Sequence, residues 1–158
     1  MKKIILLTGG GDLPLEVIEG LKKKKIKYFC IIFNNNPVSK VIYKNEHKLI
    51  DFGKVISELF RLKTKGYNNI LMVGNIKRPS LKDIKPDLNS LKLIPKFTKH
   101  LLQGGDNNLL SFCVEQLQKF GFKVLDLRKI IPENFLNYGN QTEIKLTKIK
   151  LDDIKKGK

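Results

Sequence analysis

The sequence predicts an α/β fold in which five parallel strands form one Rossmann-like sheet with helices on both faces. Short apolar runs rich in strand formers alternate five times with stretches of helical period. Three of the turns between them are rich in glycine. The 158 residues suffice for one domain with a substantial core, but not for two. Right-handed crossovers then favour the strand order 3-2-1-4-5, with the turns after strands 1 and 4 side by side.

The first strand and the loop after it predict an anion-binding site. Residues 4–7 form an unbroken apolar run, and Gly9, Gly10 and Gly11 follow closely. We expect Asp12 to cap the next helix, because a carboxylate there can accept a hydrogen bond from the first turn. Glycines let a phosphate approach the backbone, and the helix dipole attracts it. The dinucleotide-binding fingerprint is incomplete, so a tight turn without a ligand is the alternative.

The remaining elements follow from apolar periodicity and from glycine and proline positions. Gly66 and Gly121 are predicted to end helices. We expect strands at 27–33, 47–51, 69–73 and 122–126, and helices at 15–25, 54–65, 80–103 (broken near Pro86 and Pro95) and 109–120.

Two later turns should lie near the first, because ligands bind beyond the carboxyl ends of parallel strands. After residues 69–73 come Gly74, Asn75, Lys77 and Arg78, whose side chains offer donors for phosphate or a sugar hydroxyl. Another glycine turn, residues 104–108, opens the last long helix. An ordinary polar loop is the alternative for the turn that contains Asn75, Lys77 and Arg78.

The segment 91–103, LKLIPKFTKHLLQ, has a basic amphipathic pattern. Lysines fall on one part of the predicted helix surface. Such a helix can pack on the core, lie on a membrane or cover a lipid chain. The apolar side is expected to contain Ile94, Phe97, Thr98, Leu101 and Leu102.

The net charge of +16 does not by itself indicate nucleic-acid binding. Only three of the 31 basic residues are arginine, the side chain that reads phosphates and bases best, and no aromatic RNA-binding motif is present. An RNA-binding domain therefore remains a less favoured hypothesis. The apolar runs are too short for a membrane span or a signal peptide. Cys30 and Cys113 are expected to be buried and reduced, as in a cytoplasmic protein.

The sequence divides into a Rossmann-like domain, residues 1–132, and a polar segment, residues 133–158. The second part reads as a linker followed by the first turn of another helix, which could not be stable alone. We expect it to begin a truncated second domain. A frayed basic tail is the competing interpretation.

Six motifs occur in the order and spacing of the N-terminal domain of LpxI-type UDP-2,3-diacylglucosamine pyrophosphatases, which the chain therefore resembles. The resemblance implies a metal-dependent hydrolase of lipid A biosynthesis that produces UMP and 2,3-diacylglucosamine 1-phosphate. It also implies a cytoplasmic protein, peripheral to the inner membrane, with a second domain that supplies the essential aspartate. The motifs are GGGDLP (9–14), DFGK (51–54), GNIKRP (74–79), KLIPKF (92–97), GGDNNLL (104–110) and EQLQKFGF (115–122).

The resemblance implies substrate contacts in this chain but leaves the catalytic residues unknown. Magnesium or manganese is implied for the full enzyme, with ligands expected outside this chain, since Asn107 stands where the family usually has a second acid. The expected partners are UDP-2,3-diacylglucosamine, the lipid product, a membrane surface and the second domain; a homo-oligomer is compatible, and nucleic acid is not expected. A stand-alone nucleotide or sugar-nucleotide binding module is the alternative function. The substrate-binding residues would be Gly10, Gly11, Asp12, Leu13, Asn75, Arg78, Gly105 and Asp106.

Overall fold

A computed structural model of the chain describes residues 2–80, 84–103 and 105–132. One sheet of five strands occupies its centre, and every strand pairing is parallel. The strand order is β3-β2-β1-β4-β5, which confirms the predicted topology. The strands are β1 (Lys3–Thr8), β2 (Lys27–Phe33), β3 (His47–Ile50), β4 (Asn69–Val73) and β5 (Lys123–Val124).

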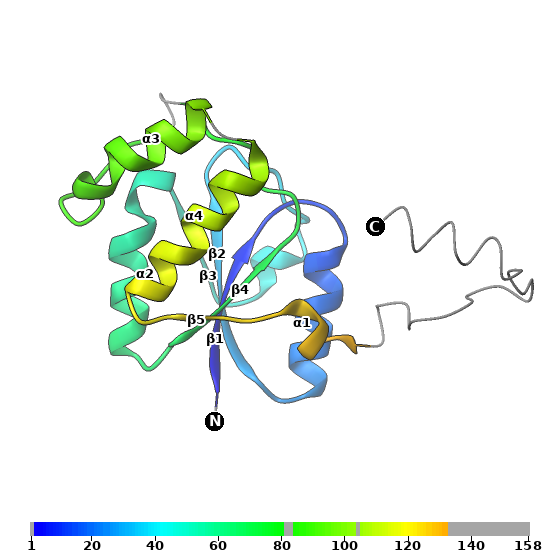
Figure 1. Cartoon of the computed structure of the whole chain (residues 1–158). Helices are drawn as coiled ribbons and strands as arrows, with labels where there is room; N and C mark the ends of the chain where they lie inside the picture. The colour runs from blue at the N-terminus through cyan, green and yellow to red at the C-terminus, as the bar shows by residue number, and fades with distance from the viewer. Residues whose placement is uncertain (1, 81–83, 104, 133–158) are drawn as a thin grey trace, which may run out of the picture.

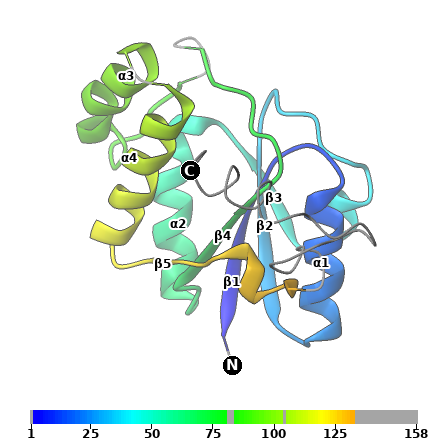
Figure 2. The ribbon, with the colours of Figure 1, turned by 45° about the vertical axis from the view of Figure 1, so that its right-hand side comes forward.

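Helices cover both faces of the sheet, so the molecule has three layers (Figures 1 and 2). Helix α1 (Leu13–Lys23) lies on one face; α2 (Val55–Thr64) and α4 (Asp106–Lys119) lie on the other. The helix α3 (Ile94–Gln103) lies near the carboxyl ends of the strands, next to α4. Short 3-10 helices complete the secondary structure: η1 (Ile42–Lys44), η2 (Phe52–Lys54), η4 (Leu91–Leu93) and η5 (Leu127–Lys129).

Strand β1 is an unbroken apolar run that is buried on both faces of the sheet. Successive side chains of a strand point to opposite faces. Ile5 and Leu7 therefore join the cluster under α2 and α4, whereas Ile4 and Leu6 join the cluster under α1. All four are almost completely buried, because both faces of this central strand are covered.

The long helix expected over residues 80–103 is shorter than predicted. Residues 84–87 have no regular secondary structure, and the helical part begins only at Leu91. Pro86 disfavours a helical conformation in the residue before it. This segment also lies directly over Gly53, where a Cβ would stand 2.5 Å from the carbonyl carbon of Lys85. This tertiary contact, together with the proline, overrides the apolar periodicity. Residues 81–83 lie outside the described part.

Other boundaries differ modestly from expectation. Helix α1 starts two residues earlier than predicted, α4 starts three residues earlier, and β5 contains only Lys123 and Val124. Gly66 and Gly121 follow α2 and α4 with φ angles of +85° and +77°, as expected for residues that end helices. Cys30 and Cys113 are both free thiols, Cys30 buried and Cys113 half-buried. The predictions for residues 133–158 lie outside the described residues.

Candidate functional site

The loops after β1 and β4 form one unit at the carboxyl ends of the strands. Gly10 and Asn75 form an isolated antiparallel bridge in which each N–H donates to the other's carbonyl, both at 2.9 Å. The Gly9 N–H donates to the Val73 carbonyl at 2.8 Å. A Cβ on Gly9 would lie 2.6 Å from the carbonyl carbon of Asn75. The two turns are therefore side by side, as the strand order predicts, and their backbones touch.

This contact assigns different structural roles to the three consecutive glycines. The Gly10 N–H is already used by Asn75, so Gly10 shapes the loop and does not offer that donor to a ligand. Gly11 has a φ angle of +91° and open space around its missing Cβ. Of the three, only Gly11 therefore faces a space that a ligand can fill without displacing protein atoms.

The N-terminus of α1 has the unpaired donors that an anion requires. Among the described residues, the N–H groups of Gly11, Asp12 and Leu13 have no backbone acceptor. Asp12 occupies the N-cap position, but its side chain makes no capping hydrogen bond. The expected capping role of Asp12 is thus wrong: its backbone is already helical at φ −88° and ψ −26°, whereas N-cap residues that cap through the side chain are usually extended. The free N–H groups and the helix dipole remain available to a negative ligand.

Asn36 is a site residue that the sequence analysis overlooked. It follows β2 in a run of three asparagines, and its side chain is only 6% exposed. Its Oδ1 accepts a hydrogen bond from the Lys77 N–H at 2.8 Å, which connects the β2 loop to the β4 loop. Its Nδ2 is buried and has no partner among the described residues. The available signal was a polar run at the carboxyl end of a central strand, where ligands bind in such sheets.

Arg78 connects the β4 loop to helix α3. Its guanidinium donates to the carbonyl oxygen of Leu101, close to the negative end of α3. The structure thus brings Asn75 against the first loop but places Arg78 against α3. A contact between Arg78 and phosphate stays a prediction.

The third predicted loop is less defined as a site. Gly105 is the N-cap residue of α4, and its carbonyl accepts from the N–H groups of Asn108 and Leu109. Its φ of −68° is accessible to any residue, and a Cβ there would meet nothing within 4 Å. The side chain of Asp106 lies outside the described part.

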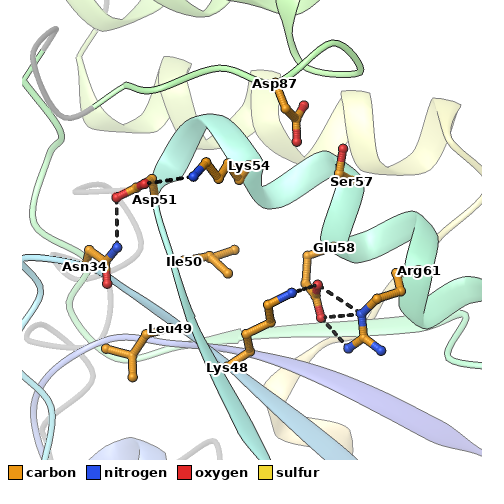
Figure 3. A pocket seen from close by; sticks show the side chains of 10 residues that line it. All are labelled: Asn34, Lys48, Leu49, Ile50, Asp51, Lys54, Ser57, Glu58, Arg61 and Asp87. Atoms are coloured by element: carbon orange, nitrogen blue, oxygen red, sulfur yellow. Dashed lines mark hydrogen bonds and ion pairs between the residues drawn. The ribbon is translucent and has the colours of Figure 1, made fainter.

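A second feature near this end of the sheet is a cavity of about 500 Å³ between β3 and α2 (Figure 3). Its deepest charge is the Glu58 carboxylate, which is 4% exposed. Lys48 Nζ lies 2.6 Å from one carboxylate oxygen, and the Arg61 Nε donates at 2.9 and 3.0 Å to both. Burial alone would raise the pKa of Glu58, but these hydrogen bonds outweigh it and lower the pKa.

The rim of the cavity has a second set of paired polar groups. Asn34 Nδ2 donates to the Asp51 carboxylate at 2.8 Å, and Lys54 Nζ lies 3.5 Å from its other oxygen. The hydrogen bond from Asn34, supported by nearby lysines, lowers the pKa of Asp51. The ion pairs that line this cavity anchor the edge strand β3 to α2. Because its main charges neutralise one another, the cavity offers no unbalanced charge to a ligand.

Titratable chemistry is sparse in the described residues. They contain no group of three or more His, Cys, Asp or Glu side chains able to hold a metal ion. Burial raises the pKa of both Cys30 and Cys113 to about 11, so both thiols stay protonated and poorly nucleophilic at neutral pH. No helix in this part of the chain has the length and apolar character needed to cross a membrane.

Comparison with known proteins identifies the family. The sequence model of the LpxI N-terminal domain matches residues 3–134, most of the chain. A comparison with curated proteins found no match. The matched region includes the complete sheet and the loops after β1 and β4, whose backbones touch. The chain therefore belongs to the LpxI N-terminal domain family.

Proposed function

We propose that this chain is the substrate-binding half of a hydrolase of lipid A biosynthesis. The reaction would split the pyrophosphate of UDP-2,3-diacylglucosamine into UMP and 2,3-diacylglucosamine 1-phosphate. The main support is that a family match over residues 3–134 coincides with a loop whose free donors suit a phosphate. The family membership supports the pathway, and the loop geometry supports the class of ligand.

A phosphate of the substrate would sit at the N-terminus of α1. The N–H groups of Gly11, Asp12 and Leu13 supply donors there, and Gly11 leaves the approach open. Such fixed donors are already oriented before the charge develops on the phosphate oxygens, so little reorganisation is needed. Asn36 and Asn75 hold the neighbouring loops in place, which keeps this geometry constant.

The reaction forms a bond between a water oxygen and one phosphorus and breaks a bridging P–O bond. The leaving phosphate takes the electron pair, and a base takes the proton from water. Gly11, Asp12 and Leu13 would bind and orient the pyrophosphate during this step. We place the base and the essential aspartate in the second domain. Magnesium or manganese would neutralise phosphate charge, but the described residues do not form a metal site, so we derive no step through a metal.

A second candidate function is a nucleotide-binding module without catalysis. The observation that favours it is the same lack of a metal-holding group in the described residues, combined with an intact anion site. The two candidates differ in the ligand. A module of this kind should bind UMP or UDP about as tightly as the lipid-linked nucleotide, whereas a domain of the hydrolase should prefer the complete substrate.

The test is calorimetric titration of the 158-residue chain with UDP-2,3-diacylglucosamine in detergent, next to a UMP-release assay with Mg²⁺ or Mn²⁺. We expect saturable binding and no UMP release. Gly11→Ala should weaken binding about tenfold or more: alanine keeps the N–H, but its Cβ fills the open approach and strains the positive φ, which displaces the phosphate from a hydrogen bond worth roughly 1.5–3 kcal/mol. Arg78→Ala should weaken it through the released β4 loop, and Arg78→Lys should restore part of the affinity.

A control that removes positive charge far from the loop separates a specific site from general attraction. Lys22, Lys23 and Lys25 are exposed at the far end of α1, and their joint replacement by Ala should leave affinity almost unchanged. Lys24 is left intact because its ammonium donates to the Ile130 carbonyl. If the lysine variant binds the substrate more weakly than the Gly11→Ala protein does, a diffuse electrostatic surface would explain binding better than the loop site. Rapid UMP release by this chain alone would show that the catalytic residues lie within it.

A further inference from the structure

The exposed side of η4 and α3 has two parallel stripes of different chemistry. Lys92, Lys96 and Lys99 are spaced i, i+4 and i+7, so they follow one line along the helical segment. All three are exposed. No Asp or Glu occurs anywhere in residues 91–103, so acidic neighbours in the sequence do not neutralise this stripe.

The second stripe is apolar and runs beside the first. Pro95 and Leu102 are spaced i and i+7, about two turns of α3, so they lie at nearly the same angle, and Leu91 precedes them in η4. Leu91 is 56% exposed and Leu102 is 67% exposed. Leu102, which the sequence pattern places on the apolar side of this helix, is therefore exposed, since α3 has more apolar side chains than its contact with the protein can cover.

The opposite side of α3 holds the helix against the protein. Leu101 is buried, and the His100 ring stacks on Phe112 of α4 with centroids 4.5 Å apart. Arg78 donates to the Leu101 carbonyl from the β4 loop. The two stripes are thus presented by a helix that is anchored at its inner side and directly connected to a loop of the candidate site.

We propose that the exposed face of η4 and α3 docks on an anionic lipid bilayer. The leucine stripe would enter the interface between headgroups and acyl chains, and the lysine stripe would contact the phosphates beside it. Protein-protein interfaces are depleted in lysine at their centres, so a face with one lysine per turn beside leucines fits lipid better than a protein partner. The charge complementarity with anionic lipid selects the occupant.

Docking in this orientation would direct the candidate site towards the lipid. Helix α3 lies at the end of the molecule where the strands end and the loops after β1 and β4 meet (Figures 1 and 2). The inference specifies a face for the membrane location that the family resemblance implies. Because vesicle binding involves no hydrolysis, its failure would leave the proposed reaction untouched.

The first test is co-sedimentation of the full chain with vesicles of phosphatidylcholine alone or mixed with phosphatidylglycerol, in about 0.1 M salt. We expect binding only to the mixed vesicles. Replacing Lys92, Lys96 and Lys99 together by Gln should lower the partition coefficient about tenfold or more, since each lysine near an anionic surface adds about fivefold. The same replacement at Lys22, Lys23 and Lys25 removes equal charge and should lower it much less. Equal losses of vesicle binding in the two triple variants would show that general electrostatic attraction, and not the face of η4 and α3, holds the chain on the lipid.

The second test reports directly on insertion. The chain contains no tryptophan, so Leu102→Trp places a single tryptophan in the apolar stripe, whose emission is excited selectively over that of the tyrosines. Leu49→Trp is the matched control, because Leu49 is 47% exposed on β3, away from α3. With mixed vesicles, the emission of the Leu102→Trp variant should shift to the blue and be quenched by lipids brominated in the acyl chain. The emission of the Leu49→Trp variant should not respond.

Two outcomes of the fluorescence test contradict the proposal. An unchanged emission spectrum of the Leu102→Trp variant in the presence of bound vesicles would show that another face contacts the lipid. A blue shift that grows with protein concentration and needs no vesicles would show that a second copy of the chain covers this face instead.

Discussion

Two contacts in this molecule are made in different ways: the contact between the loops after β1 and β4, and the contact between β3 and α2. Backbone atoms make the first contact, and side chains make the second. In the first, backbone touches backbone: Gly9 and Gly10 lie against Asn75, and a Cβ on Gly74 would stand 2.6 Å from the Gly10 carbonyl oxygen. In the second, side chains meet across a cavity around the buried Glu58 carboxylate (Figure 3). The backbone contact tolerates no added atom, whereas the side-chain contact depends on charge and hence on pH.

Gly9→Ala should have the largest effect and tests the backbone contact. Its Cβ would collide with three backbone atoms of Asn75, which cannot rotate away as a side chain does. We expect a loss of about 3 kcal/mol or more in the free energy of unfolding, at the upper end for overpacking. Chemical denaturation measures it. Gly105→Ala is the control and should lose no more than about 1 kcal/mol: its Cβ would meet nothing, and the remaining cost is the preference of an N-cap position for glycine over alanine. Similar losses in both variants would contradict the rigid backbone contact.

Glu58→Gln should have the next largest effect and tests the side-chain contact. The amide keeps the shape of the side chain but removes the charge that Lys48 and Arg61 contact. A loss of about 2 kcal/mol is expected, as for hydrogen bonds to a charged group. Glu115→Gln is the matched control, since the Glu115–Lys119 pair is exposed to solvent and should contribute little to stability. Equal effects in urea denaturation would show that burial of Glu58 does not strengthen its pairing.

The pH dependence of the free energy of unfolding tests the same contact. The pKa of Glu58 is lowered in the folded protein, so as pH falls the unfolded chain takes up the proton first. The stabilisation from ionised Glu58 is therefore complete above about pH 5 and is lost as pH falls through the lowered folded pKa. The difference in unfolding free energy between wild type and Glu58→Gln should shrink over that range. A difference that stays constant down to about pH 3 would show that ionisation of Glu58 contributes nothing.

Gly11→Ala should have the smallest effect on stability and a clear effect on ligand binding. Its φ of +91° costs a side chain roughly 1–2 kcal/mol, but no neighbouring atom is displaced. Thermal denaturation should therefore show a smaller loss than Gly9→Ala, and titration with the substrate should show the weakened binding described above. A Gly11→Ala protein as unstable as Gly9→Ala would mean that Gly11 also supports the loop contact.

Much of the site could be predicted from local sequence, but the roles within it could not. Three successive glycines before a helix predict a close approach, and the strand order places Asn75 nearby. Only the folded chain shows that Gly10 uses its N–H on Asn75, whereas the Gly11 N–H has no backbone acceptor within the part of the chain that the structure describes. Asn36 was missed for the same reason: its importance comes from Lys77, 41 residues away, and spacing along the chain does not reveal such a partner.

The sequence by itself determined the strands, their order and most helix positions, because apolar periodicity and glycine turns act over a few neighbouring residues. The tertiary structure decided what depends on distant partners. It keeps residues 84–87 out of a helix and against Gly53, leaves Leu102 exposed, and surrounds Glu58 with cations from two different elements. Local pattern specifies which face of an element is apolar, but only packing decides how much of that face finds a partner.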